Sequence, residues 1–81
     1  MDAVEIAKYN DKFVDASIFD RCSARGFVYN GNFYEMQQDH SNGSNSFNFK
    51  KLDCLSIIGL TPFFSATNKQ REIVENFVSW I

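Results

Sequence analysis

The stretch Phe27–Tyr34, which reads Phe-Val-Tyr-Asn-Gly-Asn-Phe-Tyr, consists of two aromatic runs joined by Asn30-Gly31. Asn-Gly supplies the two residues of positive φ that a type I′ turn requires, and it is the strongest short-range signal for a β-hairpin. A two-residue turn also fixes the register of the strands. It pairs Tyr29 with Asn32, Val28 with Phe33, and Phe27 with Tyr34.

Residues that pair across two strands share a face, so this register sorts the side chains of the hairpin. One face carries Phe27, Tyr29, Asn32, Tyr34 and Met36. The other face carries Val28, Phe33 and Glu35. A hairpin that is apolar on both faces is not stable alone in water. One face therefore meets the helices, and the other face must be covered by something else.

Residues 2–24 are predicted to form a helix. At 100° per residue, their apolar side chains, from Ala3 to Ala24, fall within about 180° of arc, and Cys22 lies among them. Gly26 follows at a position typical of a helix end. Asn10-Asp11 leaves an alternative open: it would split the helix, or turn a hairpin between residues 4–9 and 12–18.

The second half of the chain begins with a polar stretch, 37–46, which predicts a loop. Ser46–Lys50 then alternates with Phe47 and Phe49 on one face, which predicts a third antiparallel strand. Lys50-Lys51 is interpreted as a pair of lysines that protects an edge strand.

Three helix signals follow that strand. Asp53 can cap a short helix over Cys54–Ile58, which Gly59 would end. Thr61-Pro62 resembles a cap and a first helical position. Thr67 with Gln70 forms a capping box, and it precedes an apolar stripe that ends on Trp80-Ile81.

The predicted fold class is therefore α+β. It is a small three-stranded antiparallel meander packed against an N-terminal helix and C-terminal helices, in a single domain over residues 1–81. A chain of this length buries only roughly 60–65% of its unfolded surface, so its core is small. Thirteen aromatic residues, 16% of the chain, enlarge that core.

The charge of the chain limits the classes of partner that we expect it to bind. The net charge is −2, and residues 1–20 hold five acidic residues against two lysines, a net of −3. Nucleic-acid binding normally needs a basic stripe, so a nucleic-acid partner is not expected.

The longest apolar patch, near Ile57-Ile58, is broken by Gly59, so no membrane span is expected. The N-terminus has no pattern of a secretory signal, which predicts a cytoplasmic protein.

No group of residues matches a known catalytic or metal-binding pattern. Cys22, His40 and Cys54 are the residue types of a cysteine enzyme, but their spacing fits no zinc site, and two buried thiols with a loop histidine are expected. The carboxylate pairs Asp11/Asp15 and Glu72/Glu75 are expected to face solvent. The sequence contains no phosphate-binding glycine pattern. We therefore expect no enzyme activity, no metal and no cofactor.

The remaining candidate site is the aromatic face of the hairpin. Tyrosine and methionine are enriched at the centres of protein interfaces, so this face is interpreted either as core under the helices or as an interface. The partner-binding residues predicted on that basis are Phe27, Tyr29, Asn32, Tyr34 and Met36.

The functional hypothesis is a non-enzymatic protein-binding module that occludes a partner protein. Its size and composition are those of a small inhibitor, an immunity-type protein or a phage-encoded antagonist. The alternative is a structural subunit that forms a homodimer through the uncovered sheet face or a strand edge. A DNA-binding regulator and a small enzyme have less support.

Overall fold

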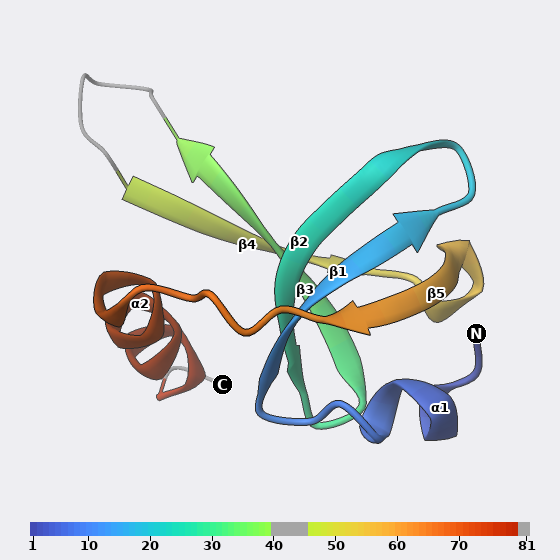
Figure 1. The fold of residues 1–81 in the computed structure, drawn as a ribbon, viewed down its shortest axis with the longest axis horizontal. Coiled ribbons are helices and arrows are strands. Elements are labelled where there is room, and N and C mark those ends of the chain that lie inside the picture. The colour runs from blue at the N-terminus through green and yellow to red at the C-terminus, as the bar shows by residue number, and fades with distance from the viewer. Residues whose placement is uncertain (40–45, 80–81) are drawn as a thin grey trace.

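The computed structural model describes residues 1–39 and 46–79 and shows an α+β fold (Figure 1). Its elements in chain order are α1 (Ala3–Ala7), β1 (Lys12–Ile18), β2 (Arg21–Tyr29), β3 (Asn32–Asp39), β4 (Ser46–Leu52), the 3₁₀ turn η2 (Cys54–Ser56), β5 (Ile57–Pro62) and α2 (Asn68–Val78). The strands form one antiparallel sheet in the order β4-β3-β2-β1-β5. The expected sheet of three strands is therefore wrong in its number of strands.

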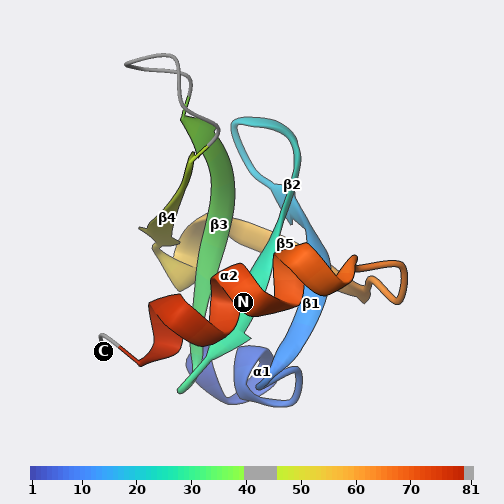
Figure 2. The same cartoon turned by 90° about the vertical axis from the view of Figure 1, so that its left-hand side faces the viewer.

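The two helices lie on different sides of this sheet. α1 lies at the end of the sheet near the β2–β3 turn, and α2 crosses the sheet at a distance from α1 (Figure 2). An extended segment, residues 63–67, joins β5 to α2. The sheet thus has an inner face, which meets α1, and an outer face, which meets α2.

The long N-terminal helix is wrong. A helix covers Ala3–Ala7 alone, and residues 12–29 form β1 and β2. The break falls at the anticipated place, because Asp11 has a φ of 64° and its backbone N–H donates to the Val28 carbonyl (2.7 Å). Val14 and Ile18 are four residues apart, so they share a face in a helix and in a strand alike.

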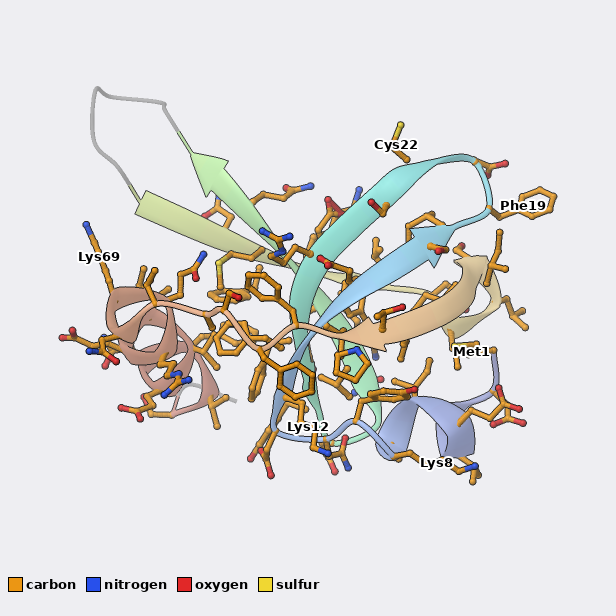
Figure 3. The ribbon with its side chains drawn as sticks, viewed as in Figure 1. Met1, Lys8, Lys12, Phe19, Cys22 and Lys69 are labelled. Carbon is orange, nitrogen blue, oxygen red and sulfur yellow. The ribbon has the colours of Figure 1, made fainter. Side chains whose placement is uncertain are left out.

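The strand pattern of this region is visible in its alternate residues. Val14, Ala16 and Ile18 are buried, whereas Asp15 and Ser17 are not. Cys22, expected on the apolar face of a helix, lies instead on β2 and points away from the body of the molecule (Figure 3). The turn that brings β1 to β2 carries Phe19, which also points outward.

The hairpin is confirmed in its turn and its register. Asn30 and Gly31 have φ of 53° and 79°. The strands pair Tyr29 with Asn32, Val28 with Phe33, and Phe27 with Tyr34. Asn10 Oδ1 accepts from the Gly31 N–H (3.0 Å), so the segment that follows α1 also holds this turn.

The main core lies on the inner face of the sheet. Its fully buried large side chains are Phe33, Ile6, Ile57, Val14 and Val28. Gly26 lies directly under the ring of Phe33, where an added Cβ would stand 2.8 Å from two ring carbons. Gly26 therefore lets both the Tyr34 carbonyl and the Phe33 ring approach the backbone of β2, and its interpretation as a helix end is wrong.

The third strand of the hairpin region is confirmed as β4, which forms one edge of the sheet. Lys50 and Lys51 are exposed on it, in agreement with their interpretation as edge lysines. Residues 37–39 extend β3 rather than forming a loop. Residues 40–45 of the expected loop lie outside the described residues.

The helices expected after residue 53 are correct in part. Asp53 does cap a turn, since its Oδ1 accepts from the Leu55 N–H (3.1 Å). That turn ends at Ser56, however, and Gly59, Thr61 and Pro62 belong to β5 rather than to helix boundaries. The β-branched pair Ile57-Ile58 favours a strand here.

The final helix is confirmed as α2, with its capping box. The Thr67 hydroxyl oxygen accepts from the Gln70 N–H (3.1 Å), and Gln70 Oε1 accepts from the Thr67 N–H (2.9 Å). Its Trp80-Ile81 end lies outside the described residues.

Candidate functional site

Aromatic side chains from four neighbouring strands gather on the outer face of the sheet. Phe13 on β1 pairs with Phe27 on β2, which in turn pairs with Tyr34 on β3. Phe49 on β4 pairs with Met36, two residues beyond Tyr34, so it shares this face. The rings of Phe13 and Phe27 meet edge to face, with centroids 5.3 Å apart. We call these four residues the aromatic row.

α2 rests on one end of the aromatic row through Phe77. The Phe77 ring stacks on Phe49, with centroids 4.2 Å apart and planes at 19°, and it meets Tyr34 edge to face at 5.1 Å. Val74, one turn earlier, is the buried residue of this helix. The helix is therefore attached along one narrow side, at Val74 and Phe77.

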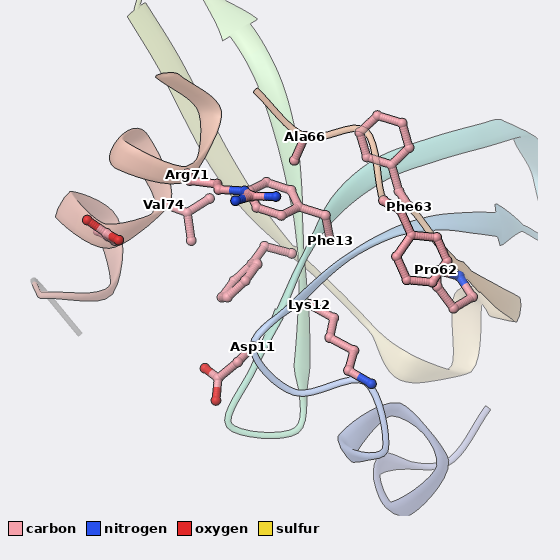
Figure 4. Close-up of a pocket in the computed structure, with 11 residues that line it drawn as sticks. Asp11, Lys12, Phe13, Pro62, Phe63, Ala66, Arg71 and Val74 are labelled. Carbon is pink, nitrogen blue, oxygen red and sulfur yellow. The ribbon is translucent and has the colours of Figure 1, made fainter. Parts of the chain in front are cut away.

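The other end of the aromatic row remains open and forms the floor of a groove of about 400 Å³. Figure 4 shows the lining side chains, which come from the start of β1, from β2, from the end of β5 and the segment after it, and from α2. Phe13 and Phe27 contribute the floor, and Val74 contributes to the α2 side. The remaining lining residues are Asp11, Lys12, Pro62, Phe63, Phe64, Ala66, Arg71 and Glu75.

The wall formed by Phe63 is held in place from β2. The Arg25 guanidinium lies over the Phe63 ring, 3.8 Å from its centroid, and its Nε donates to Asp15 Oδ1 (2.8 Å). The Phe63 N–H donates to the Phe13 carbonyl (2.9 Å). Phe63 in the wall is thus joined to Phe13 in the floor. For residues 64–66 of the same segment, the described part of the chain shows no comparable hydrogen bond or ring contact.

The chemistry of the groove is apolar, with charges of both signs at its border. The charged lining residues are Asp11, Lys12, Arg71 and Glu75. Phe64 is 85% exposed, so the apolar surface extends from the groove onto the outside of the molecule. Such a site can enclose an apolar side chain and leave its polar neighbours in water.

The structure separates the five predicted partner-binding residues. Phe27 is buried in the floor of the groove, and Tyr34 packs beneath Phe77. Tyr29, Asn32 and Met36 are half-buried along the same face. Both faces of the hairpin are thus covered by a helix, since α2 lies on this face and Ile6 of α1 packs in the main core with Val28 and Phe33 of the opposite face. The expectation that only one face meets the helices is wrong.

The residues that were weighed for catalysis do not assemble. Cys22 is exposed, contrary to the expected burial, and Cys54 is half-buried in η2. His40 lies outside the described residues. Asp11 and Asp15 are separated by the entry to β1, where Asp15 pairs with Arg25. The described residues contain no group of three or more metal-ligating side chains.

Sequence reasoning missed Phe13, Phe63, Arg71 and Val74 as members of one site. Phe13 was placed on a helix, although the alternation from Val14 to Ile18 signals a strand. Arg71 and Val74 are one turn apart on a correctly predicted helix, but the path of the segment that precedes it has no local sequence signal.

No family model, curated protein or solved structure matches this chain. Within residues 1–39 and 46–79, no helix has the length and apolar content needed to cross a membrane.

Proposed function

We propose that this chain is a non-enzymatic protein-binding module that takes an apolar side chain of its partner into the groove beside α2. The observation that supports the proposal is the groove of about 400 Å³ with its aromatic floor. Pockets that bind small ligands range from about 300 to 1,000 Å³, so this groove has room for one or two side chains. Buried aromatic or aliphatic anchors of this kind supply most of the affinity of a protein interface.

In this proposal the aromatic residues of the hairpin act together with α2. Phe27 contacts the inserted side chain from the floor, and Tyr34 holds Phe77 and hence the helix that forms the opposite wall. Exposed Phe64 contacts the partner at the border of the groove. By binding its partner, the chain covers the partner's surface, as an inhibitor or antagonist would. The proposed location is the cytoplasm.

The proposal is tested by affinity capture from a lysate of the source, with quantitative mass spectrometry of three baits. These are the wild type, Phe64→Ser, and Val4→Ser as a control that removes another exposed apolar side chain, 73% exposed, on α1. One near-stoichiometric partner should be recovered by the wild type and by Val4→Ser. Its recovery should fall about tenfold with Phe64→Ser, the equivalent of about 1.4 kcal/mol. Equal recovery by all three baits would contradict the groove as the binding site.

The homodimer remains the alternative, but both edges of the sheet are obstructed. Along β5, the Tyr9 hydroxyl donates to the Leu60 carbonyl (3.5 Å) and the Met1 nitrogen donates to the Ile57 carbonyl (2.7 Å). Along β4, lysines disfavour a further strand. Light scattering distinguishes the two functions, since a homodimer has twice the monomer mass of 9.3 kDa.

A further inference from the structure

α2 is attached to the sheet mainly through two of its side chains. Val74 is its buried residue, and the Phe77 ring lies 4.2 Å from Phe49 and 5.1 Å from Tyr34 between centroids. Figure 2 shows the helix lying across the strands, at the end of the extended segment that follows β5. The helix is therefore held by a ring contact at one end of the aromatic row.

The segment that leads to α2 can change its direction without losing a hydrogen bond. At its start the Phe63 N–H donates to the Phe13 carbonyl (2.9 Å), and at its end Thr67 begins the capping box. Between these two points, residues 64–66 form no hydrogen bond or ring contact with the described part of the chain. We call residues 64–66 the hinge.

The sheet does not need α2 for its core, whereas α2 needs the sheet. Ile6, Val28 and Phe33 are almost fully buried on the inner face, which α2 does not touch. The capping box defines where α2 begins without help from the strands. A helix of 11 residues is nevertheless only marginally stable in water by itself. A detached α2 is therefore stabilised by any aromatic row that is free to receive it.

The charges of α2 do not oppose its packing on another copy of the chain. The helix carries two basic and two acidic side chains, Lys69, Arg71, Glu72 and Glu75, a net of zero. The β1 side of the groove carries one charge of each sign, Asp11 and Lys12. A neutral helix approaching this side meets no net repulsion.

We propose that α2 exchanges between two copies of this chain, so that the helix of each copy covers the aromatic row of the other. The helix of a second copy fits this surface because it presents the same Val74 and Phe77 to the same Tyr34 and Phe49. Exchange of an identical element is a low-cost route to a dimer, since only the hinge changes conformation. It uses neither edge of the sheet, unlike a homodimer of two closed copies.

The exchanged dimer builds each groove from two chains. Phe13 and Phe27 of the floor come from one copy, and Arg71 and Val74 of the α2 wall come from the other. The exchange does not depend on whether the groove binds a partner. If the groove does bind one, the dimer holds two such sites in one molecule, and a partner with two matching side chains gains affinity from both.

Protein concentration determines which form is populated. A short linker keeps α2 close to its own aromatic row, at an effective concentration in the millimolar range. The wild type should therefore be a monomer at about 20 μM and should contain a large fraction of dimer at about 2 mM. NMR diffusion measurements at the higher concentration and light scattering at the lower one follow this change.

Isotope-filtered NMR identifies the exchange itself. Isotope-labelled and unlabelled wild-type chains are mixed in equal amounts at about 2 mM, the range of the effective concentration. The filter retains only contacts between two copies, so a signal between the Phe77 ring and the Phe49 or Tyr34 ring arises from the exchanged dimer alone. A wild type that stays monomeric at this concentration, or a dimer without this signal, overturns the proposal.

Hinge length supplies the matched variants. Deletion of Ser65 and Ala66 shortens the chain between Phe63 and Thr67 by about 7 Å, so α2 cannot reach its own row. This variant should be a dimer at micromolar concentration, whereas insertion of Gly-Ser after Ser65 should leave a monomer. Phe77→Ala in the shortened variant should raise the Kd of the dimer at least tenfold. A shortened variant that is monomeric, or whose dimer is unaffected by Phe77→Ala, would contradict the exchange.

Discussion

The two faces of the sheet are packed in different ways. On the inner face, Ile6 of α1 meets Val14, Val28 and Phe33, and all four are almost fully buried. On the outer face, α2 buries Val74 and lays Phe77 against two rings, and a groove remains beside it. Stability depends on apolar area removed from water, so the inner face should determine whether the chain folds.

The outer face is where we place the proposed binding site, for the same reason. An open aromatic floor keeps apolar surface available for a partner, whereas a closed core does not. Because α2 follows an extended segment and packs mainly through Val74 and Phe77, we expect it to open locally at a lower free energy than the strands beneath it. The inner face thus stabilises the fold, and the proposed site lies on the outer face.

The largest expected effect is that of Phe33→Ala, which removes the largest fully buried side chain of the inner face. Such a truncation costs about 3–5 kcal/mol. Proteins of this length have a total stability of about 4–12 kcal/mol, so the variant should be partly or wholly unfolded at 25 °C. Urea denaturation followed by far-UV circular dichroism measures the loss. A loss below about 1 kcal/mol would contradict the close packing of this face.

Gly26→Ala tests the close approach of β3 to β2 at this position. The new methyl group would stand 2.8 Å from ring carbons of Phe33 and closer still to the Tyr34 backbone. Overpacking of this kind costs about 1–3 kcal/mol. The control is Gly59→Ala, since nothing lies within 4 Å of a Cβ added there. Equal urea midpoints for the two variants would show that neither the Phe33 ring nor the Tyr34 carbonyl constrains position 26.

Phe77→Ala should weaken the packing of α2 on the outer face and leave the inner face unchanged. Each aromatic pair contributes about 0.5–1.5 kcal/mol beyond its buried area, and Phe77 makes two such pairs. We expect α2 to lose its protection from hydrogen exchange while β1 to β3 keep theirs. Phe64→Ala, which removes a ring that is 85% exposed, is the matched control. Loss of protection throughout the sheet would contradict the independence of the two faces.

Thr67→Ala has the smallest expected effect. It removes the acceptor for the Gln70 N–H at the start of α2. Loss of a threonine cap costs typically about 1 kcal/mol, and here the cost should fall on α2 alone. Circular dichroism at 222 nm should show reduced helix, and Thr67→Ser should restore it. An unchanged helix signal would show that the capping box is dispensable.

The parts of the fold that were predictable from the sequence are those with a local signal. The hairpin was predictable with its register because Asn30-Gly31 dictates a local geometry. The capping box of Thr67 and Gln70 was predictable for the same reason. β1 was anticipated only in the alternative that turned a hairpin at Asn10-Asp11, and its true partners, β2 and β5, were not identified.

The groove was even harder to predict from the sequence. The face that carries Phe27 and Tyr34 follows from the register, but its partners Phe13 and Phe63 are brought there by the sheet and by the segment after β5. That segment has an extended path fixed by Arg25 over Phe63, a contact between residues 38 positions apart in the chain. No local pattern encodes such a contact.

Native-state hydrogen exchange at single-residue resolution tests the central claim most directly. The claim is that α2 opens locally over a sheet whose stability comes from the opposite face. We predict that the amides of α2 exchange through openings of distinctly lower free energy than those of Ala24 and Val28 in β2, and with little dependence on denaturant. One shared opening free energy for α2 and β2, rising and falling together with denaturant, would contradict it.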